Sequence, residues 1–215
     1  MQMDKLFHSA IISFRVKYIV GIDEVGRGPL AGPVAVGVLV LKESRKRFRP
    51  DAHRGETFLR DSKQLSAKQR EKWFEIIRAE RQRGALDFSV SFVSHKLIDK
   101  RGLTWALRIA TARSLARLAI PNDSAIFLDG GLRAPKIFKN QRTIIKGDEK
   151  IPAIALASIV AKVTRDRLMI RLAKKYPQYG FEKHKGYGTA AHYEALKKHG
   201  LCPIHRRSFL LKFRR

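Results

Sequence analysis

The apolar positions of the chain fall into short continuous runs and into stripes with helical spacing. The runs are rich in β-branched residues and are bounded by glycine, proline or charged residues, which is typical of buried strands. One segment alternates apolar and polar residues instead, as a half-buried strand does. We expect strands at residues 18–23, 33–41, 86–93, 125–128 and 142–145.

The stripes repeat every three or four residues and predict helices between and after these strands. Ser66 and Gln69 have the spacing of a capping box at the start of the first helix. Pro152 stands in the first turn of the longest one. The order of elements predicts an α/β fold, a mixed five-stranded sheet flanked by helices. We expect helices at 66–83, 103–118, 151–175 and 190–199, and loops at 26–32 and 176–188.

The chain shows no repeat, no low-complexity tract and no linker long enough to separate domains. We expect a single domain over residues 1–215, with a basic loop at about 42–60 and a short C-terminal tail. The longest apolar run, 29–41, is shorter than the ~20 residues needed to span a bilayer. Cys202 is the single cysteine, which excludes an internal disulfide framework and a multi-cysteine zinc site. We expect a cytoplasmic, monomeric protein with no membrane partner.

The net charge indicates which classes of binding partner to consider first. Lys and Arg total 45 against 19 Asp and Glu, a formal net charge of +26. Solubility alone requires a magnitude of roughly 2–8 in a small domain. An excess of this size attracts polyanions, so nucleic acid is the first partner to consider and an anionic membrane the second.

The scarce acids stand at the ends of predicted strands. Asp23 and Glu24 end the first strand, Asp129 ends a later one, and Asp148 follows another directly before a helix. Ligand chemistry in open α/β sheets gathers at such strand ends. Taken singly, each aspartate is also compatible with a turn, and Asp148 with a favourable charge at a helix N-terminus.

Asp23 and Glu24 are adjacent, and adjacent side chains of a regular strand point to opposite faces. They can share one site only if the strand breaks there, and Gly26 and Gly28 are suited to such a break. Two carboxylates ~4 Å apart repel by roughly 4 kcal/mol at an effective dielectric near 20. Mg²⁺ or Mn²⁺ neutralises clusters of this kind, and a pair of such ions can cleave a phosphodiester.

Several motifs together resemble ribonuclease HII, the type 2 ribonuclease H family. They occur in the family's order and span about residues 18–210. Any one of them could arise by chance, whereas the ordered set is specific. The matching blocks are Asp23–Pro33, Asp61–Leu65, Leu128–Gly130, Lys146–Asp148, Ala157–Asp166, His184–Tyr187 and His205–Phe209.

The resemblance implies a ribonuclease H-like fold and hydrolysis of the RNA strand in RNA–DNA hybrids. It also implies nicking of duplex DNA 5′ to single embedded ribonucleotides, as in ribonucleotide excision repair, leaving 3′-hydroxyl and 5′-phosphate ends. Two Mg²⁺ or Mn²⁺ ions would be involved. By position, the metal ligands and catalytic residues would be Asp23, Glu24, Asp129 and Asp148, the ribose 2′-hydroxyl contacts Gly26, Arg27 and Gly28, and the junction contact Tyr187.

Three cations in the matching blocks, Lys63, Arg165 and Lys185, are candidate contacts to the substrate backbone. Lys63 or Arg165 could equally pair with an active-site carboxylate, or with Asp61 or Asp166, for structure. Asp166 lies inside a predicted helix and we expect a structural role. His184 and His205 are expected in ordinary loop roles. The basic loop 42–60 is longer than the resemblance leads us to expect, either as duplex-binding surface or as solvated chain.

Two other functions compete with this interpretation. The first is a nucleic-acid-binding protein without catalytic activity, which the net charge favours and the acids at strand ends oppose. The second is another nuclease of the same fold, such as a resolvase or transposase-like enzyme. The Gly-Arg-Gly turn and the His-Lys-Gly-Tyr block favour the ribonucleotide-specific enzyme.

Overall fold

A mixed five-stranded sheet forms the centre of the protein, with strand order β3-β2-β1-β4-β5. The computed structural model describes residues 18–42 and 65–211. The sheet confirms the predicted α/β architecture, and each predicted strand is present within about three residues of its expected bounds. The strands are β1 (Tyr18–Val25), β2 (Val34–Lys42), β3 (Leu86–Val93), β4 (Ala125–Asp129) and β5 (Gln141–Ile144).

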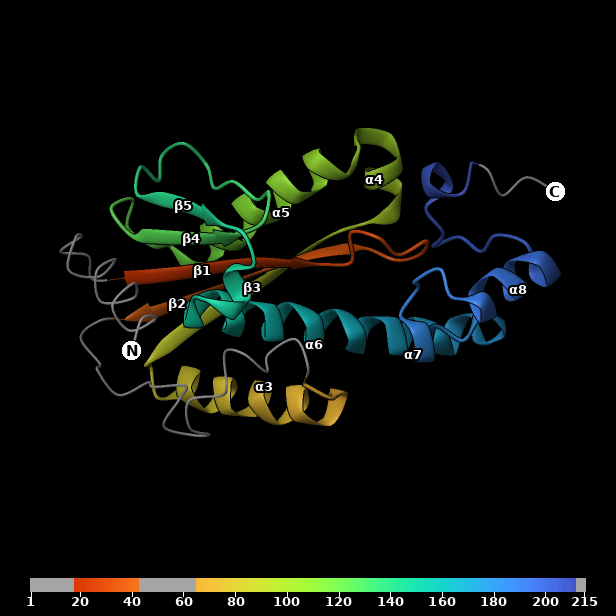
Figure 1. Ribbon diagram of the computed structural model, residues 1–215, viewed down its shortest axis with the longest axis horizontal. Helices are drawn as coiled ribbons and strands as arrows, with labels where there is room; N and C mark the ends of the chain where they lie inside the picture. The colour runs from red at the N-terminus through yellow and green to blue at the C-terminus, as the bar shows by residue number, and fades with distance from the viewer. Residues whose placement is uncertain (1–17, 43–64, 212–215) are drawn as a thin grey trace.

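Strand direction follows from the length of the connections. β1, β2 and β3 pair antiparallel, and the short bend between Val25 and Val34 joins the first two. β4 pairs parallel with β1, and β5 pairs parallel with β4, as longer crossover connections allow. The carboxyl ends of β1, β4 and β5 therefore meet at one edge of the sheet (Figure 1).

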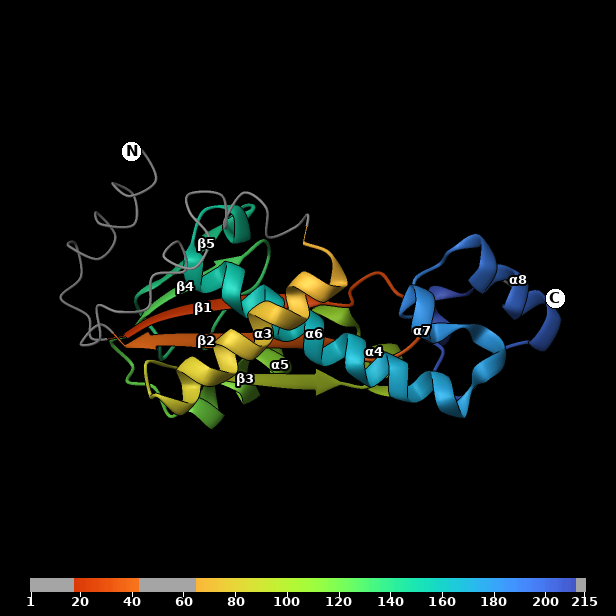
Figure 2. The same ribbon diagram turned by 90° about the horizontal axis from the view of Figure 1, so that it is seen from below.

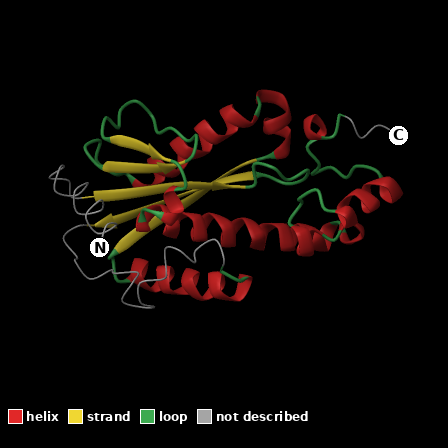
Figure 3. Cartoon of the chain, in the orientation of Figure 1, coloured by secondary structure: helices red, strands yellow, loops and turns green. Residues whose placement is uncertain are grey.

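Helices cover both faces of the sheet (Figure 3). On one face, α5 packs against β2 and β3, with α4 beside it. On the other face, α6 lies across β1 and β2, and α3 packs beside α6. The last two helices lie beyond the end of the sheet around an apolar cluster of their own (Figure 2). The helices are α3 (Ala67–Gln82), α4 (His95–Arg101), α5 (Leu103–Leu118), α6 (Pro152–Lys175), α7 (Phe181–His184) and α8 (Ala190–His199).

Local signals located most helices well. The capping box is confirmed: Ser66 Oγ accepts from the Gln69 amide at 3.2 Å, and Gln69 Oε1 accepts from the Ser66 amide at 2.8 Å. Two helices were missed. The short α4 was not predicted, and α7 lies within the segment 176–188 that was expected to be loop.

The helix α4 carries Asp99, which binds the C-terminal segment of the described chain. The Asp99 carboxylate accepts from the Arg207 amide at 2.9 Å and from the Ser208 amide at 3.1 Å. Ser208 Oγ donates to the same carboxylate at 2.5 Å. These bonds fix the C-terminal segment of the described chain against the body of the domain.

Two glycines let α6 lie directly on the sheet. A Cβ on Gly21 of β1 would come within 2.0 Å of the Ala153 carbonyl carbon, and one on Gly37 of β2 within 2.6 Å of the Ala157 oxygen. No heavy-atom side chain fits either space. The pair sets the separation of helix and sheet, and therefore the depth at which side chains of α6 reach the strand ends.

We expect Gly21→Ala to destabilise the fold, because the added methyl group meets rigid backbone of α6. The free energy of unfolding should fall by roughly 1–3 kcal/mol or more, the range typical of an overpacked core. Guanidinium chloride unfolding of the variant and wild type measures it. Gly131→Ala is the matched control, since a Cβ there meets nothing within 4 Å. Equal midpoints for Gly21→Ala and the control would contradict the close approach.

Candidate active site

Four carboxylates gather where the parallel strands end. Ile22 of β1 is in register with Leu128 of β4, so Asp23 and Asp129 are the next residues of two neighbouring parallel strands. Asp129 Oδ1 accepts from the Gly147 amide at 2.6 Å, which brings the 3₁₀ turn Gly147–Glu149 and its buried Asp148 to the same edge. The sheet thus assembles acids that are up to 125 positions apart in the chain.

β1 does not break at Asp23 and Glu24, although we expected such a break if the two side chains were to share one site. β1 stays in register with β2 through Val25, and the break comes at Gly26, whose φ is +89°. The pairing of β1 with β4, however, already ends at Ile22, one residue before Asp23. Both carboxyls lie close enough to Asp129 for its negative charge to raise their pKa values, so the two adjacent side chains reach the same acidic edge.

The carboxyl of Asp23 is buried at the end of β1, and its pKa is strongly raised. Burial raises the pKa of this carboxyl to about 8, and the charges of Glu24 and Asp129 add to the rise. A hydrogen bond with the Ser158 side chain of α6 and one from the Glu24 amide (2.8 Å) oppose it. A carboxylate placed this way is costly to ionise unless a cation joins it.

Glu24 is only partly compensated. Its Oε1 accepts from Arg27 Nη1 at 2.8 Å, while its Oε2 is buried with no hydrogen-bond partner. Burial raises the pKa of Glu24 and outweighs the lowering by Arg27. An orphaned carboxylate oxygen beside other carboxylates is a ready ligand for a hard divalent cation.

The donor chemistry at this edge fits Mg²⁺ or Mn²⁺, which prefer carboxylate oxygen. In the described ranges 18–42 and 65–211, no three His, Cys, Asp or Glu side chains are yet arranged around a common ion position. The carboxylates instead take nearby donors, Glu24 from Arg27 and Asp129 from the Gly147 amide. The residues therefore suit a divalent ion by composition and by uncompensated charge.

The glycine turn lies beside this acidic edge. Gly26 has no room for a side chain, since a Cβ there would meet Arg165 Nε at 2.3 Å. Gly28 faces Tyr187: a Cβ on Gly28 would lie 3.9 Å from Tyr187 Cε1. Arg27 between them is exposed and reaches back to Glu24. The residues predicted to read the ribose and the junction thus come together from two distant parts of the chain.

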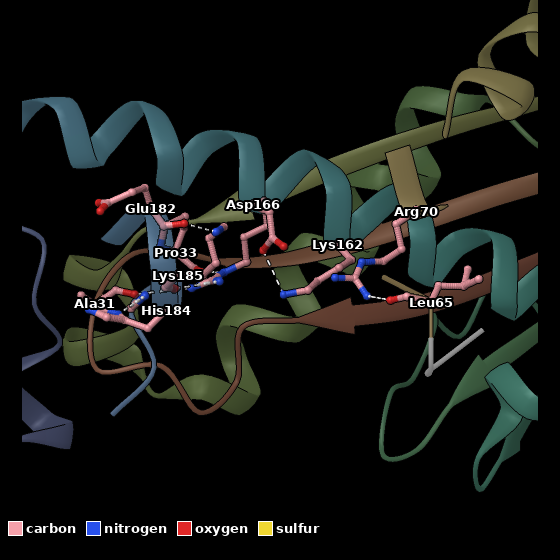
Figure 4. Close-up of polar contacts among 11 residues, drawn as sticks. Ala31, Pro33, Leu65, Arg70, Lys162, Asp166, Glu182, His184 and Lys185 are labelled. Atoms are coloured by element: carbon pink, nitrogen blue, oxygen red, sulfur yellow. Dashed lines mark hydrogen bonds and ion pairs between the residues drawn. The ribbon is translucent and has the colours of Figure 1, made fainter. Parts of the chain in front are cut away.

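Arg165 is not placed for the substrate contact predicted for it, and the alternative pairing with Asp61 involves a residue outside the described chain. Its side chain is completely buried, so it presents no surface to a substrate backbone. It also makes no ion pair with an active-site carboxylate or Asp166 within the described chain, where Lys162 holds Asp166 at 3.0 Å (Figure 4). The guanidinium instead donates to three backbone carbonyls, those of Pro33 (2.9 Å), Lys185 (3.1 Å) and Ala31 (3.4 Å).

A second buried guanidinium, that of Arg206, holds the glycine turn itself and was not predicted as a site residue. It donates to the carbonyls of Gly26 at 2.7 Å, Arg27 at 2.8 Å and Gly32 at 2.9 Å. Burial, followed by the charge of nearby Arg165, lowers the pKa of Arg206 to about 9. Its place in the His205–Phe209 block was the one available signal, since the sequence does not show which charged residues are buried.

Of the two candidate lysines, Lys185 lies in the described chain, next to the loop that Arg165 holds. Lys185 is half-buried in a left-handed conformation (φ +53°), and its Nζ donates to the Glu182 carbonyl. Its own carbonyl is held by Arg165 (Figure 4). Lys63, with Asp61 and nearly all of the basic loop 42–60, lies outside the described residues.

Comparison with known proteins adds independent evidence. The family model described as Ribonuclease HII matches residues 20–212. The chain belongs to the ribonuclease HII family. A curated relative, Ribonuclease HII of Endomicrobium trichonymphae, is 47% identical over 191 residues, covering 89% of this chain and 84% of the relative. The recognition from motifs is therefore confirmed.

Solved structures of the family have the same fold. Ribonuclease H2 of Pyrococcus horikoshii OT3 aligns with a TM-score of 0.63 at 30% identity, covering 89% of this chain and 93% of that one. The PCNA:RNase HII complex of Archaeoglobus fulgidus aligns with a TM-score of 0.66 at 28% identity, covering 87% and 92%. As a member of this family, the chain is an endoribonuclease with ribonuclease H activity on RNA–DNA, and the family depends on divalent metal. Within its described part, no helix is long and apolar enough to cross a membrane.

We expect Asp23→Asn to stabilise the metal-free protein at alkaline pH. The folded-state pKa of Asp23 is raised from 3.8 to about 8, so the stability linked to its protonated form is complete below about pH 4 and is lost as pH rises through 8. Asparagine stays neutral and removes that loss. Thermal unfolding in chelator at pH 8.5 should show a gain of at least ~1 kcal/mol, roughly 2–4 °C, which shrinks toward pH 4.

The matched control is Asp123→Asn, because Asp123 lies exposed in a turn. Divalent metal should reverse the order by stabilising wild type more than Asp23→Asn. A variant no more stable than wild type at any pH between 4 and 9 would contradict the burial of this carboxyl.

Proposed function

We propose that this ribonuclease HII cleaves the RNA strand of hybrids and also nicks duplex DNA 5′ to a single embedded ribonucleotide. Asp23, Glu24, Asp129 and Asp148 would hold two divalent ions, and the products would carry 3′-hydroxyl and 5′-phosphate ends. The observation that carries the proposal is the juxtaposition of the acidic edge with the glycine turn, where Arg27 is bonded to Glu24. Residues suited to phosphodiester hydrolysis thereby adjoin residues suited to reading ribose.

The bound ions would activate water and stabilise the leaving oxygen of the phosphodiester. The chain itself supplies the ligands and a fixed place for the sugar. Gly26 and Gly28 offer backbone to a 2′-hydroxyl, the group that distinguishes ribose from deoxyribose. Arg206 fixes that backbone by binding the carbonyls of Gly26 and Arg27. Recognition of the ribose is in this way coupled to the position of the scissile bond.

Tyr187 completes the reading surface. Its ring is partly exposed beside Gly28, with Lys162 Nζ and the Arg165 guanidinium each 5.9 Å from the ring centre. We place it against the nucleotide at the junction between RNA and DNA, where a flat ring can pack on a sugar or base. Arg165 acts here as a positioning residue, because its burial leaves it no substrate contact.

Lys63 and Lys185 are assigned to the phosphate backbone, and the net charge of +26 draws both RNA–DNA hybrid and ribonucleotide-containing duplex to the surface. The protein would act as a monomeric, single-domain cytoplasmic enzyme. Mg²⁺ and Mn²⁺ are both compatible with the carboxylate donors.

The decisive experiment uses a labelled DNA duplex with one ribonucleotide, tested with Mg²⁺, with Mn²⁺ and with chelator. We expect one cut 5′ to the ribonucleotide that disappears in chelator. Asp129→Asn should lower the rate by about 100-fold or more, because a lost ligand costs at least as much as a lost outer-shell partner. Glu194→Gln is the control, since Glu194 is an exposed acid on α8.

The alternative outcomes separate the parts of the proposal. Cleavage of long hybrid without the single cut would keep the metal site and remove the assigned roles of Gly26, Gly28 and Tyr187. Binding without divalent-dependent cleavage of either substrate would contradict the enzymatic function. A wild-type rate in Asp129→Asn would show that the ligands are wrongly assigned.

We expect Gly28→Ala to lower cleavage of both substrates by roughly tenfold while leaving the unfolding midpoint unchanged. The added methyl group is only in ordinary contact with Tyr187, at 3.9 Å, so the fold tolerates it. It nevertheless occupies the space offered to the ribose, and one poor contact of ~1.4 kcal/mol is tenfold in rate. Steady-state kinetics with Gly131→Ala as control measures the effect. Unchanged kinetics would mean that Gly28 does not face the sugar.

A further inference from the structure

Two buried histidines connect the C-terminal segment to the tyrosine that we place at the junction. His192 in the first turn of α8 is completely buried, and His205 is only 2% exposed. Their Nε2 atoms lie 3.0 Å apart. His192 Nδ1 lies 2.9 Å from the Tyr187 carbonyl oxygen, and His205 Nδ1 lies 2.8 Å from the Cys202 amide nitrogen. The arrangement is a continuous chain of polar atoms through an apolar cluster.

The Tyr187 end of this chain fixes where the protons are in a neutral pair. The Tyr187 carbonyl can only accept, so His192 Nδ1 carries a proton, and His192 Nε2 of the neutral ring then accepts from His205 Nε2–H. His205 Nδ1 lies 2.8 Å from the Cys202 amide nitrogen and 3.2 Å from the Cys202 carbonyl oxygen. In the neutral ring this nitrogen has no proton, so it accepts from the amide. Every polar atom of both rings has a partner when both rings are neutral.

This chain of hydrogen bonds reaches the Tyr187 backbone from outside the loop that contains Tyr187. Local bonds join the Tyr187 amide to the His184 carbonyl and the Thr189 amide to the Tyr187 carbonyl, each at 2.9 Å. Thr189 is the N-cap of α8, so these bonds already place Tyr187 next to the start of that helix. The bond from His192 adds a side-chain contact from within α8 and, through His205, connects Tyr187 to the segment that carries Arg206.

We propose that His192 and His205 are positioning residues: as a neutral hydrogen-bonded pair they fix the Tyr187 backbone, and with it the ring that selects ribonucleotide junctions. The inference rests on the proposed function of Tyr187 and extends it to residues that touch no substrate. Junction cleavage should depend on the pair more than cleavage of long hybrid does. An added proton on His192 Nε2 would break the bond between the rings, and one on His205 Nδ1 would exchange the Cys202 amide for the Cys202 carbonyl as its partner.

The surroundings favour the neutral pair. The His184 ring stacks on His192 with 4.5 Å between centroids, and Tyr179 and Phe181 pack around His205. Burial, and then the charge of His192, lowers the pKa of His205 to about 4. Burial also lowers the pKa of His192, with His184 adding to the effect.

Other titratable groups around the pair give no counter-charge. His95 of α4 further lowers the pKa of His205. The Cys202 thiol is buried, which raises its pKa and keeps it uncharged. Among the described groups whose charges shift the two pKa values, the ionisable side chains are all histidines.

Two substitutions of His192 test its two hydrogen bonds separately, since each keeps one bond and removes the other. In His192→Asn, the amide nitrogen takes the place of Nδ1 and keeps the bond to Tyr187. In His192→Gln, the amide oxygen takes the place of Nε2 and keeps the bond from His205 but loses Tyr187. We expect His192→Gln to lower kcat/KM on the single-ribonucleotide duplex by roughly tenfold, the upper range for one hydrogen bond. Hybrid cleavage should fall by less than about threefold, and His192→Asn should recover most of the junction activity.

His199→Gln is the control, because His199 is an exposed histidine on the same helix. Tyr187→Ala and the double variant Tyr187→Ala/His192→Gln complete a cycle. If His192 acts through Tyr187, the second substitution should add little once the ring is gone. Equal losses from His192→Gln on both substrates, or in both backgrounds, would overturn the positioning role.

A direct measurement separates this inference from the proposed function. Long-range ¹H–¹⁵N NMR of the imidazoles should show His192 protonated at Nδ1 and His205 at Nε2, with neither ring charged at pH 6. His192 protonated at Nε2 would overturn the chain of hydrogen bonds whatever the kinetics. If the NMR result holds but Tyr187→Ala leaves junction cleavage unchanged, the assigned role of Tyr187 fails and the inferred role in selection fails with it. If Tyr187→Ala is impaired and His192→Gln is not, the positioning role alone fails.

Discussion

Two buried guanidinium groups, those of Arg165 and Arg206, hold the loops that the site depends on. Their partners are backbone carbonyls of the glycine turn and of the loop before Tyr187, with no carboxylate ion pair to either within the described chain. Burying a charge without a counter-charge is costly, and hydrogen bonds to charged groups, each about 1.5–3 kcal/mol, offset the cost. The loops therefore converge on these two side chains, and within the described chain their carbonyls satisfy the buried donors.

The acidic edge poses the opposite problem a short distance away. Asp23 is buried and Glu24 is partly buried, and each lies close enough to Asp129 to be affected by its charge. Each has a neutral or cationic neighbour, Ser158 for Asp23 and Arg27 for Glu24, that offsets part of the cost. A surface of net charge +26 attracts the polyanion, whereas this edge repels it until divalent ions are present. Cationic side chains thus attract the nucleic acid, whereas the carboxylates at the acidic edge are the groups suited to holding divalent ions.

The sequence was informative where the physics is local. Strands, the capping box at Ser66 and the helix beginning at Pro152 follow from periodicity and from residues within one turn. The four acids could be recognised because acids are scarce and stand at strand ends. Roles that depend on burial by distant segments could not. Nothing local distinguishes Arg206, which is buried, from the exposed Arg207 beside it, and the histidine pair forms only when α8 meets the loop near residue 205.

The helix α6 sets the distance between the acidic edge of the sheet and the loops that Arg165 holds. Ala153 meets Gly21 near the start of the helix, Ala157 meets Gly37, and Arg165 holds the loops from just past the middle of the helix. These contacts lie on one broad side of α6, which turns by a net ~120° between Ala153 and Arg165. Because each residue of a helix advances by about 1.5 Å and turns by roughly 100°, one inserted or deleted residue would point Arg165 away from its carbonyls. The number of residues in this stretch of α6 is therefore as constrained as their identity, and length variation in this enzyme must be accommodated in its loops.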